Sequence, residues 1–159
     1  MSPDDKALRQ QIARTLDWED AHASFDSAVK DLAPALRGRV PPGLPYSPWQ
    51  LLEHIRRTQA DILEFCVAAT YQEKEWPKDY WPESAEPPSA NAWDESITAV
   101  RRDRAALAKL ATDPKTDLLA RVPNGTGQTY LREILLTGDH TAYHVGELIV
   151  VRRLLGAWK

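Results

Sequence analysis

Two histidines, His140 and His144, stand four positions apart in the segment GDHTAYHVGEL, residues 138–148. On an ideal helix, which turns by about 100° per residue, side chains four positions apart lie only about 40° apart around the axis. Both imidazoles could therefore reach one metal ion. The same spacing also suits two imidazoles that simply share a helix face, so spacing alone leaves both interpretations open.

A third histidine, His54, stands in SPWQLLEHIRR, a second segment with helical periodicity. Three neutral imidazoles suit zinc, nickel or iron(II) and leave one or more coordination positions for water or substrate. Two other metal patterns do not apply. A zincin helix needs glutamate directly after its first histidine, where this chain has Thr141. A ferritin-like di-iron centre needs two Glu-x-x-His motifs, and only Glu19 to His22 fits.

Two carboxylates and a tyrosine are candidates for supporting roles near such a site. Helical spacing places Glu147 one turn after His144 and Asp61 two turns after His54. Either carboxylate could orient a ligating imidazole through its other ring nitrogen, or move a proton. The hydroxyl of Tyr143 could point at a bound substrate. The sequence assigns no residue as catalytic.

His22 is a further pocket candidate, because the expected first helix places it on the side that faces the core. A histidine there is more often a hydrogen-bonded structural residue than a ligand. Three aromatic residues of the connection between the second and third helices, Trp76, Tyr80 and Trp81, could close over an apolar substrate or pin that connection to the helices.

Apolar residues recur at helical spacing in four segments: 4–36, 47–70, 91–112 and 129–156. Ser47, Pro48 and Gln50 have the types and order of a capping box at the start of the second segment. No segment alternates with period two for long enough to be a strand. We therefore predict an all-α fold, a four-helix bundle formed by a single domain over residues 1–159. A connection of about 20 residues between helices two and three is long enough for a crossover, which favours an up-down-down-up order.

The composition argues against several classes of partner. The chain has 159 residues, with 20 Lys and Arg against 23 Asp and Glu, and no basic stripe that could neutralise a row of phosphates. We therefore expect no nucleic-acid partner. No apolar run approaches the roughly 20 residues that span a bilayer, so we expect no membrane association and a cytoplasmic location. Cys66 is the only cysteine, so thiolates cannot build the metal site.

Small residues recur every four positions on the fourth helix, at Gly138, Ala142 and Gly146. They lie opposite the histidine stripe and would let another backbone approach closely. Either a neighbouring helix of the same bundle or a homodimer contact could use this face.

The three histidines and the segments around them resemble the DinB-like (DNA-damage-inducible) family. The likeness covers nearly the whole chain, through DAHASFDSAV, PYSPWQLLEHIRRTQADILEFC, DYWP and DHTAYHVGELIVVRRLLGAW. The resemblance implies a metal-binding four-helix bundle, commonly dimeric, and carries the ligand role onto His54, His140 and His144. Some members look like metal-dependent thiol transferases or isomerases, and others are described as hydrolases.

The expected function is that of a metal-dependent enzyme of hydrolase or thiol-transferase type. A divalent zinc, nickel or iron ion would make water or a thiol reactive near neutral pH, with a small molecule or a thiol as substrate. The alternative is a non-catalytic stress-response module that binds a metal or a small ligand. Fold and metal site alone do not name a substrate.

Overall fold

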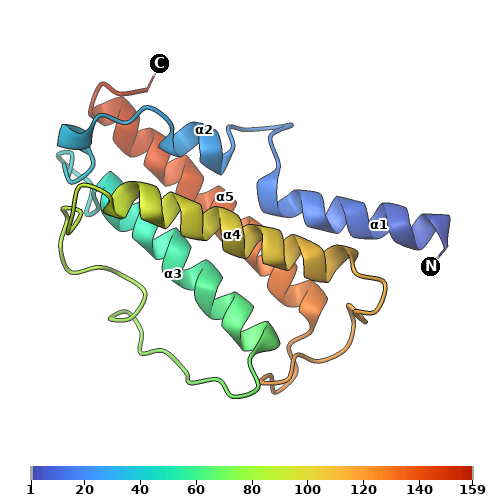
Figure 1. Ribbon diagram of the computed structural model, residues 1–159. Helices are drawn as coiled ribbons and strands as arrows, with labels where there is room; N and C mark the ends of the chain where they lie inside the picture. Colours follow the sequence, from blue (N-terminus) through green and yellow to red (C-terminus); the bar gives the residue numbers. More distant parts are fainter. Residues whose placement is uncertain (1, 159) are drawn as a thin grey trace.

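The computed structural model describes residues 2–158, so Met1 and Lys159, the ends of the predicted domain, lie outside it. Five α-helices follow one another along the chain: α1 (Pro3–Arg14), α2 (Phe25–Val29), α3 (Pro48–Val67), α4 (Ala92–Thr112) and α5 (Tyr130–Leu154). Two short 3₁₀ helices, η1 (Thr15–Asp17) and η2 (Pro34–Leu36), interrupt the first part. The described residues form no strand. The prediction of an all-α fold with about four main helices packed together is confirmed (Figure 1).

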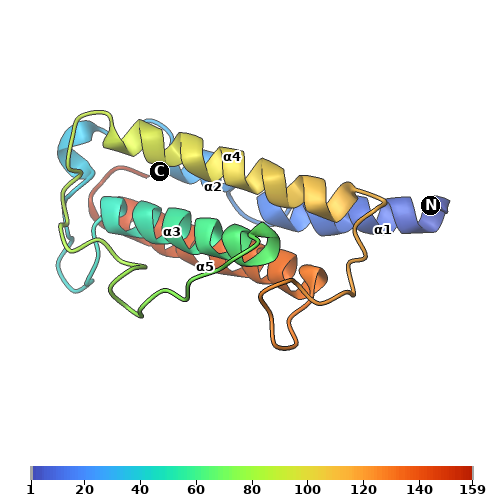
Figure 2. The same cartoon turned by 60° about the horizontal axis from the view of Figure 1, so that its bottom comes forward.

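The helices that matter for the site are α3 and α5, which pack against each other along much of their length. In both views α3 and α4 run in the same direction, whereas α5 runs opposite to them (Figure 1, Figure 2). The connection 68–91 therefore returns along the outside of α3 before α4 begins. Within the described residues, no helix is long and apolar enough to cross a membrane.

The prediction of one continuous helix over residues 4–36 is wrong. α1 ends at Arg14, and the chain passes through η1 and an irregular stretch before α2 begins. The break lies where the backbone crosses α5. A Cβ atom added to Gly138 would stand only 2.7 Å from the carbonyl oxygen of Thr15, so the two backbones are in direct contact there. This close approach is one use of the small-residue face of α5.

Local signals reinforce the break in the first segment. Ser24 starts a new helix, because its hydroxyl accepts a hydrogen bond from the backbone N–H of Ser27 at 3.2 Å. After α2, Asp31 adopts a left-handed conformation with φ of 56°, and Pro34 opens η2. The apolar residues keep their helical spacing across these interruptions, and for that reason periodicity alone predicted a single helix over residues 4–36.

The other three predicted helices are confirmed with small changes at their ends. The capping box is present: Ser47 Oγ accepts from the Gln50 N–H at 3.2 Å, and Gln50 Oε1 accepts from the Ser47 N–H at 3.1 Å. α3 ends at Val67, where residues to 70 were expected. The limits of α4 and α5 fall within about two residues of the prediction.

The main core lies between α3, α4 and α5. Its fully or nearly fully buried side chains include Trp49, Leu52, Ile55, Trp93, Val100, Leu148 and Val151. Large aromatic and branched side chains supply most of the apolar area that folding removes from water. This packing fixes the first half of α3, which carries His54, against the middle of α5, which carries His140 and His144.

Candidate metal centre

Three histidines from two helices converge at the interface between α3 and α5. The ligand nitrogens of His54, His140 and His144 all lie within 4.8 Å of one another. The Nε2 atoms of His54 and His140 are 3.0 Å apart. His140 and His144 share one face of α5, and the antiparallel packing brings that face onto His54 of α3. The spacing argument and the resemblance therefore both point to residues that the structure brings together.

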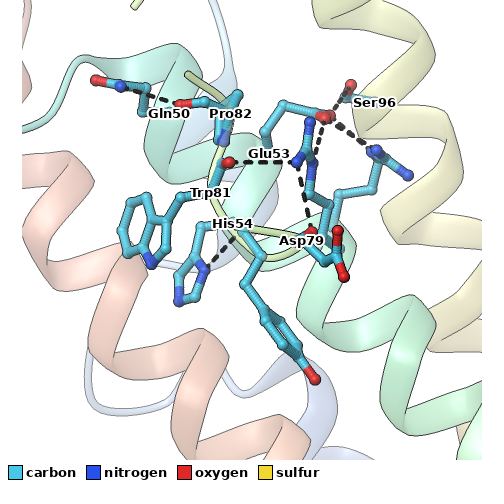
Figure 3. Close-up of polar contacts among 10 residues, drawn as sticks. Gln50, Glu53, His54, Asp79, Trp81, Pro82 and Ser96 are labelled. Atoms are coloured by element: carbon cyan, nitrogen blue, oxygen red, sulfur yellow. Dashed lines mark hydrogen bonds and ion pairs between the residues drawn. The ribbon is translucent and has the colours of Figure 1, made fainter. Parts of the chain in front are cut away.

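His54 is held on two sides by the connection 68–91. Its Nδ1–H donates to the backbone carbonyl of Tyr80 at 3.1 Å, because a carbonyl oxygen can only accept. Its ring stacks on the indole of Trp81, with centroids 3.8 Å apart and planes inclined by 7° (Figure 3). The hydrogen bond fixes the tautomer, which leaves the lone pair on Nε2 facing His140.

Burial keeps two of the imidazoles uncharged. His54 is 2% exposed, and burial lowers its pKa to about 4, although the hydrogen bond that it donates to the Tyr80 carbonyl acts in the opposite direction. Burial also lowers the pKa of His140 to about 3, with the neighbouring His144 and His54 adding to the effect. A neutral imidazole is the form that ligates a metal. His54 and His140 are therefore uncharged at neutral pH, which is the form that can bind a metal.

His144 has a carboxylate partner on its own helix. Its Nδ1 lies 2.7 Å from Oε2 of Glu147, so the ring donates to the carboxylate and keeps Nε2 free. This is the carboxylate–histidine arrangement that raises ligand basicity in metal sites. Tyr143 is 65% exposed, and its ring lies edge-on to His144 at a centroid distance of 4.9 Å. Of the two carboxylates expected to orient an imidazole, Glu147 has the required contact.

Asp61 contacts the connection 68–91 rather than an imidazole. Its two carboxylate oxygens accept hydrogen bonds from the hydroxyls of Tyr71 at 3.0 Å and Tyr80 at 2.7 Å. Burial and the hydrogen bond to Asp61 raise the pKa of Tyr71 to about 12, and the pKa of Tyr80 rises for the same reasons. Both phenols therefore stay protonated donors. Asp61 thus fixes the residue whose carbonyl orients His54.

A second set of contacts ties the same connection to α3 (Figure 3). Arg57 Nη1 donates to the backbone carbonyls of Asp79 at 3.4 Å and Trp81 at 3.3 Å. Arg57 is itself held by the buried carboxylate of Glu53, at 3.3 Å. Sequence reasoning missed this support, although the i,i+4 spacing of Glu53 and Arg57 was a usable signal.

Glu53 also joins α3 to α4. Its Oε1 accepts from Arg56 Nε and from the hydroxyl of Ser96, each at 2.6 Å. Burial alone would raise the pKa of Glu53, but the hydrogen bonds from Arg56 and Ser96 outweigh it and the pKa is lowered. The carboxylate of Glu53 is therefore charged, and both of its oxygens accept hydrogen bonds.

His22 lies away from the three-histidine cluster. The expectation that it faces the core is wrong: it is exposed, in the irregular stretch before α2, and its Nδ1 lies 3.0 Å from the carbonyl of Ala23. It lines a separate cavity of about 350 Å³ together with Trp18 and Asp139. The break in the first helix is the cause, since the predicted helical face does not exist at residue 22.

The three-histidine cluster fits a divalent metal ion by its donor chemistry. Two nitrogens each about 2.0–2.1 Å from one ion, at an angle between about 90° and 110°, stand about 2.8–3.4 Å apart. The observed 3.0 Å between the Nε2 atoms of His54 and His140 lies in this interval. The Nδ1 atoms of His54 and His144 are already occupied by acceptors. The Nε2 lone pairs of these two rings are therefore left for a metal ion to bind.

Comparison with known proteins gives one family. The DinB superfamily matches the chain over residues 17–148, a span that contains all three histidines, Glu147 and the connection 68–91. No curated protein and no solved structure matches the chain.

Proposed function

The chain belongs to the DinB superfamily, and we propose that it is a metal-dependent enzyme of hydrolase or thiol-transferase type. His54, His140 and His144 would hold the ion, which is zinc, nickel or iron(II) by the chemistry of an all-imidazole donor set. The observation that carries the proposal is the orientation of the donors. Two of the three imidazoles are fixed through Nδ1, so that Nε2 is free in the centre of the cluster.

A divalent ion, when bound, would supply Lewis acidity that lowers the pKa of water or of a thiol. The other tasks belong to the side chains. Glu147 holds the proton of His144 Nδ1 and is the carboxylate in contact with the cluster, so it is the candidate for moving a proton at the site. Trp81 covers one face of His54 and keeps water from it. Three protein ligands leave room for a substrate atom, as in catalytic zinc sites.

A second function is favoured by one feature of the site. Among the described residues, Glu147 is the carboxylate that contacts the histidines, and it is engaged with His144 Nδ1. A site whose acid serves only to orient a ligand suits a non-catalytic module that binds a metal or a small ligand. The enzyme proposal therefore requires Glu147 to exchange a proton during turnover while remaining a partner of His144.

Elemental analysis followed by an activity panel separates the two functions. Purified protein should contain about one equivalent of divalent metal, and a His140→Ala variant should lose it. The metal-loaded protein should transfer a thiol to an electrophile or cleave a member of a panel of esters and amides. Absence of both activities, together with binding of small molecules in a thermal-shift screen, would replace the enzyme by the binding module. Metal-free wild-type protein that takes up no divalent ion would overturn the enzyme and the metal-binding form of the module.

A further inference from the structure

An apolar cavity of about 310 Å³ lies beside the histidine cluster, between α5 and the segment that leads into α3. Its lining includes Leu44, Tyr46, Leu51, Gly146, Glu147 and Val150. Glu147 is the only charged residue of the lining. Cavities of this size and composition bind small organic groups, with a few polar atoms fixing orientation.

Two residues of the lining connect the cavity to the histidine cluster, Glu147 directly and Tyr46 through Trp81. Glu147 lines the cavity and also accepts from His144 Nδ1 at 2.7 Å. Tyr46 lines the cavity and stacks on Trp81 with centroids 4.0 Å apart, while Trp81 stacks on His54 on its other side. A molecule seated in the cavity would therefore have its polar end next to Glu147, one hydrogen bond away from His144.

We propose that this cavity binds an apolar, uncharged group of the substrate, a short alkyl chain or a single ring, and places the polar end of that group against Glu147, the carboxylate that accepts from His144 Nδ1. The inference rests on the proposed function, since it assigns a substrate class to that site. Charge complementarity selects the occupant: the single carboxylate of Glu147 accepts a neutral or cationic end and repels an anion. Each methylene of the bound group that is buried against the apolar walls makes the binding free energy more favourable.

Gly146 offers a clean way to block the cavity. A Cβ atom at this position would meet no other atom within 4 Å, and residue 146 lies in the exposed part of α5. Gly146→Phe adds a ring to a residue that lines the cavity, and Gly146→Ala is the matched control that adds only a methyl group. Because alanine favours helix over glycine, the control should fold at least as well as the wild type.

The test measures binding of straight-chain primary alcohols, ethanol to hexanol, by calorimetry on metal-loaded and on chelator-treated protein. In both forms the dissociation constant should fall by about fourfold per added methylene until the cavity is full. Gly146→Ala should keep this dependence, and Gly146→Phe should lose it while retaining metal content and helical circular dichroism. On chelator-treated protein, hexanoate should bind about tenfold more weakly than hexanol, because the Glu147 carboxylate repels the anion.

Two results would overturn the inference: affinity that does not grow with chain length, or the same growth in the Gly146→Phe variant. Equal binding of hexanoate and hexanol by chelator-treated protein would remove the charge selection. These readouts do not depend on a bound metal. Failure of the proposed function would show separately, as absence of metal uptake or of activity with an intact chain-length dependence.

Discussion

Replacing Glu147 by glutamine tests whether the carboxylate supports the metal through His144. The side chain keeps its shape and can still accept from Nδ1, but the charge-assisted bond at 2.7 Å becomes a neutral one. Loss of such a partner lowers metal affinity by about 10- to 100-fold. Glu147 has a side chain that is 35% exposed, so water screens part of its charge. We therefore expect about a tenfold loss, equal to about 1.4 kcal/mol of binding free energy.

The assay is competition for zinc against a chromophoric chelator at pH 7 and fixed ionic strength. Asp139→Asn is the matched control, because Asp139 is an exposed carboxylate on the same helix, directly before His140. It removes one negative charge near the site without touching a ligand, and it should change the dissociation constant by less than about threefold. An equal loss in both variants would mean that Glu147 acts only through net charge. Unchanged affinity in Glu147→Gln would refute the support role altogether.

Three further predictions concern the ligands, the role of the metal in folding, and acid stability. His140→Ala or His144→Ala should abolish stoichiometric metal binding because two imidazoles remain, whereas His22→Ala should retain the metal; elemental analysis decides. Chelation should leave the helical circular dichroism intact and lower the melting midpoint by roughly ten degrees, because the core is large and a metal a few hundredfold above its dissociation constant adds about 3–4 kcal/mol. Glu53→Gln should lower the free energy of unfolding at pH 7 by about 1.5–3 kcal/mol. Since the folded pKa of Glu53 is lowered, its contribution is present above the ordinary glutamate pKa and lost as the pH falls through the folded value, so denaturation curves of variant and wild type should converge in acid.

Much of the fold follows from local signals that the sequence displays directly. Ser47 and Gln50 define the start of α3 because the two cap hydrogen bonds need only residues three positions apart. The interruption after Arg14 could not be read in the same way. It depends on contact between Thr15 and Gly138, which are distant in sequence, and apolar periodicity continues across the irregular stretch.

The histidine cluster shows the same division between local and distant determinants. The i,i+4 spacing of His140 and His144 and the i,i+3 spacing of His144 and Glu147 are properties of one helix, so spacing made both pairs candidates for contact. The partner of His54 Nδ1 is a backbone carbonyl of the connection 68–91. Any residue type can supply a carbonyl, so sequence carries no signal for it.

The residues that hold the connection 68–91 in place nevertheless share one face of α3. His54, Arg57 and Asp61 stand at positions i, i+3 and i+7, one face of the helix, and all three contact Tyr80 or Trp81 of that connection. His54 is thus both a candidate metal ligand and one of three anchors. Movement of the connection would release the Tyr80 carbonyl from Nδ1, free the imidazole to change tautomer, and uncover its face by removing Trp81. The orientation of His54 and the position of the connection beside it therefore depend on the same contacts with one polar face of α3.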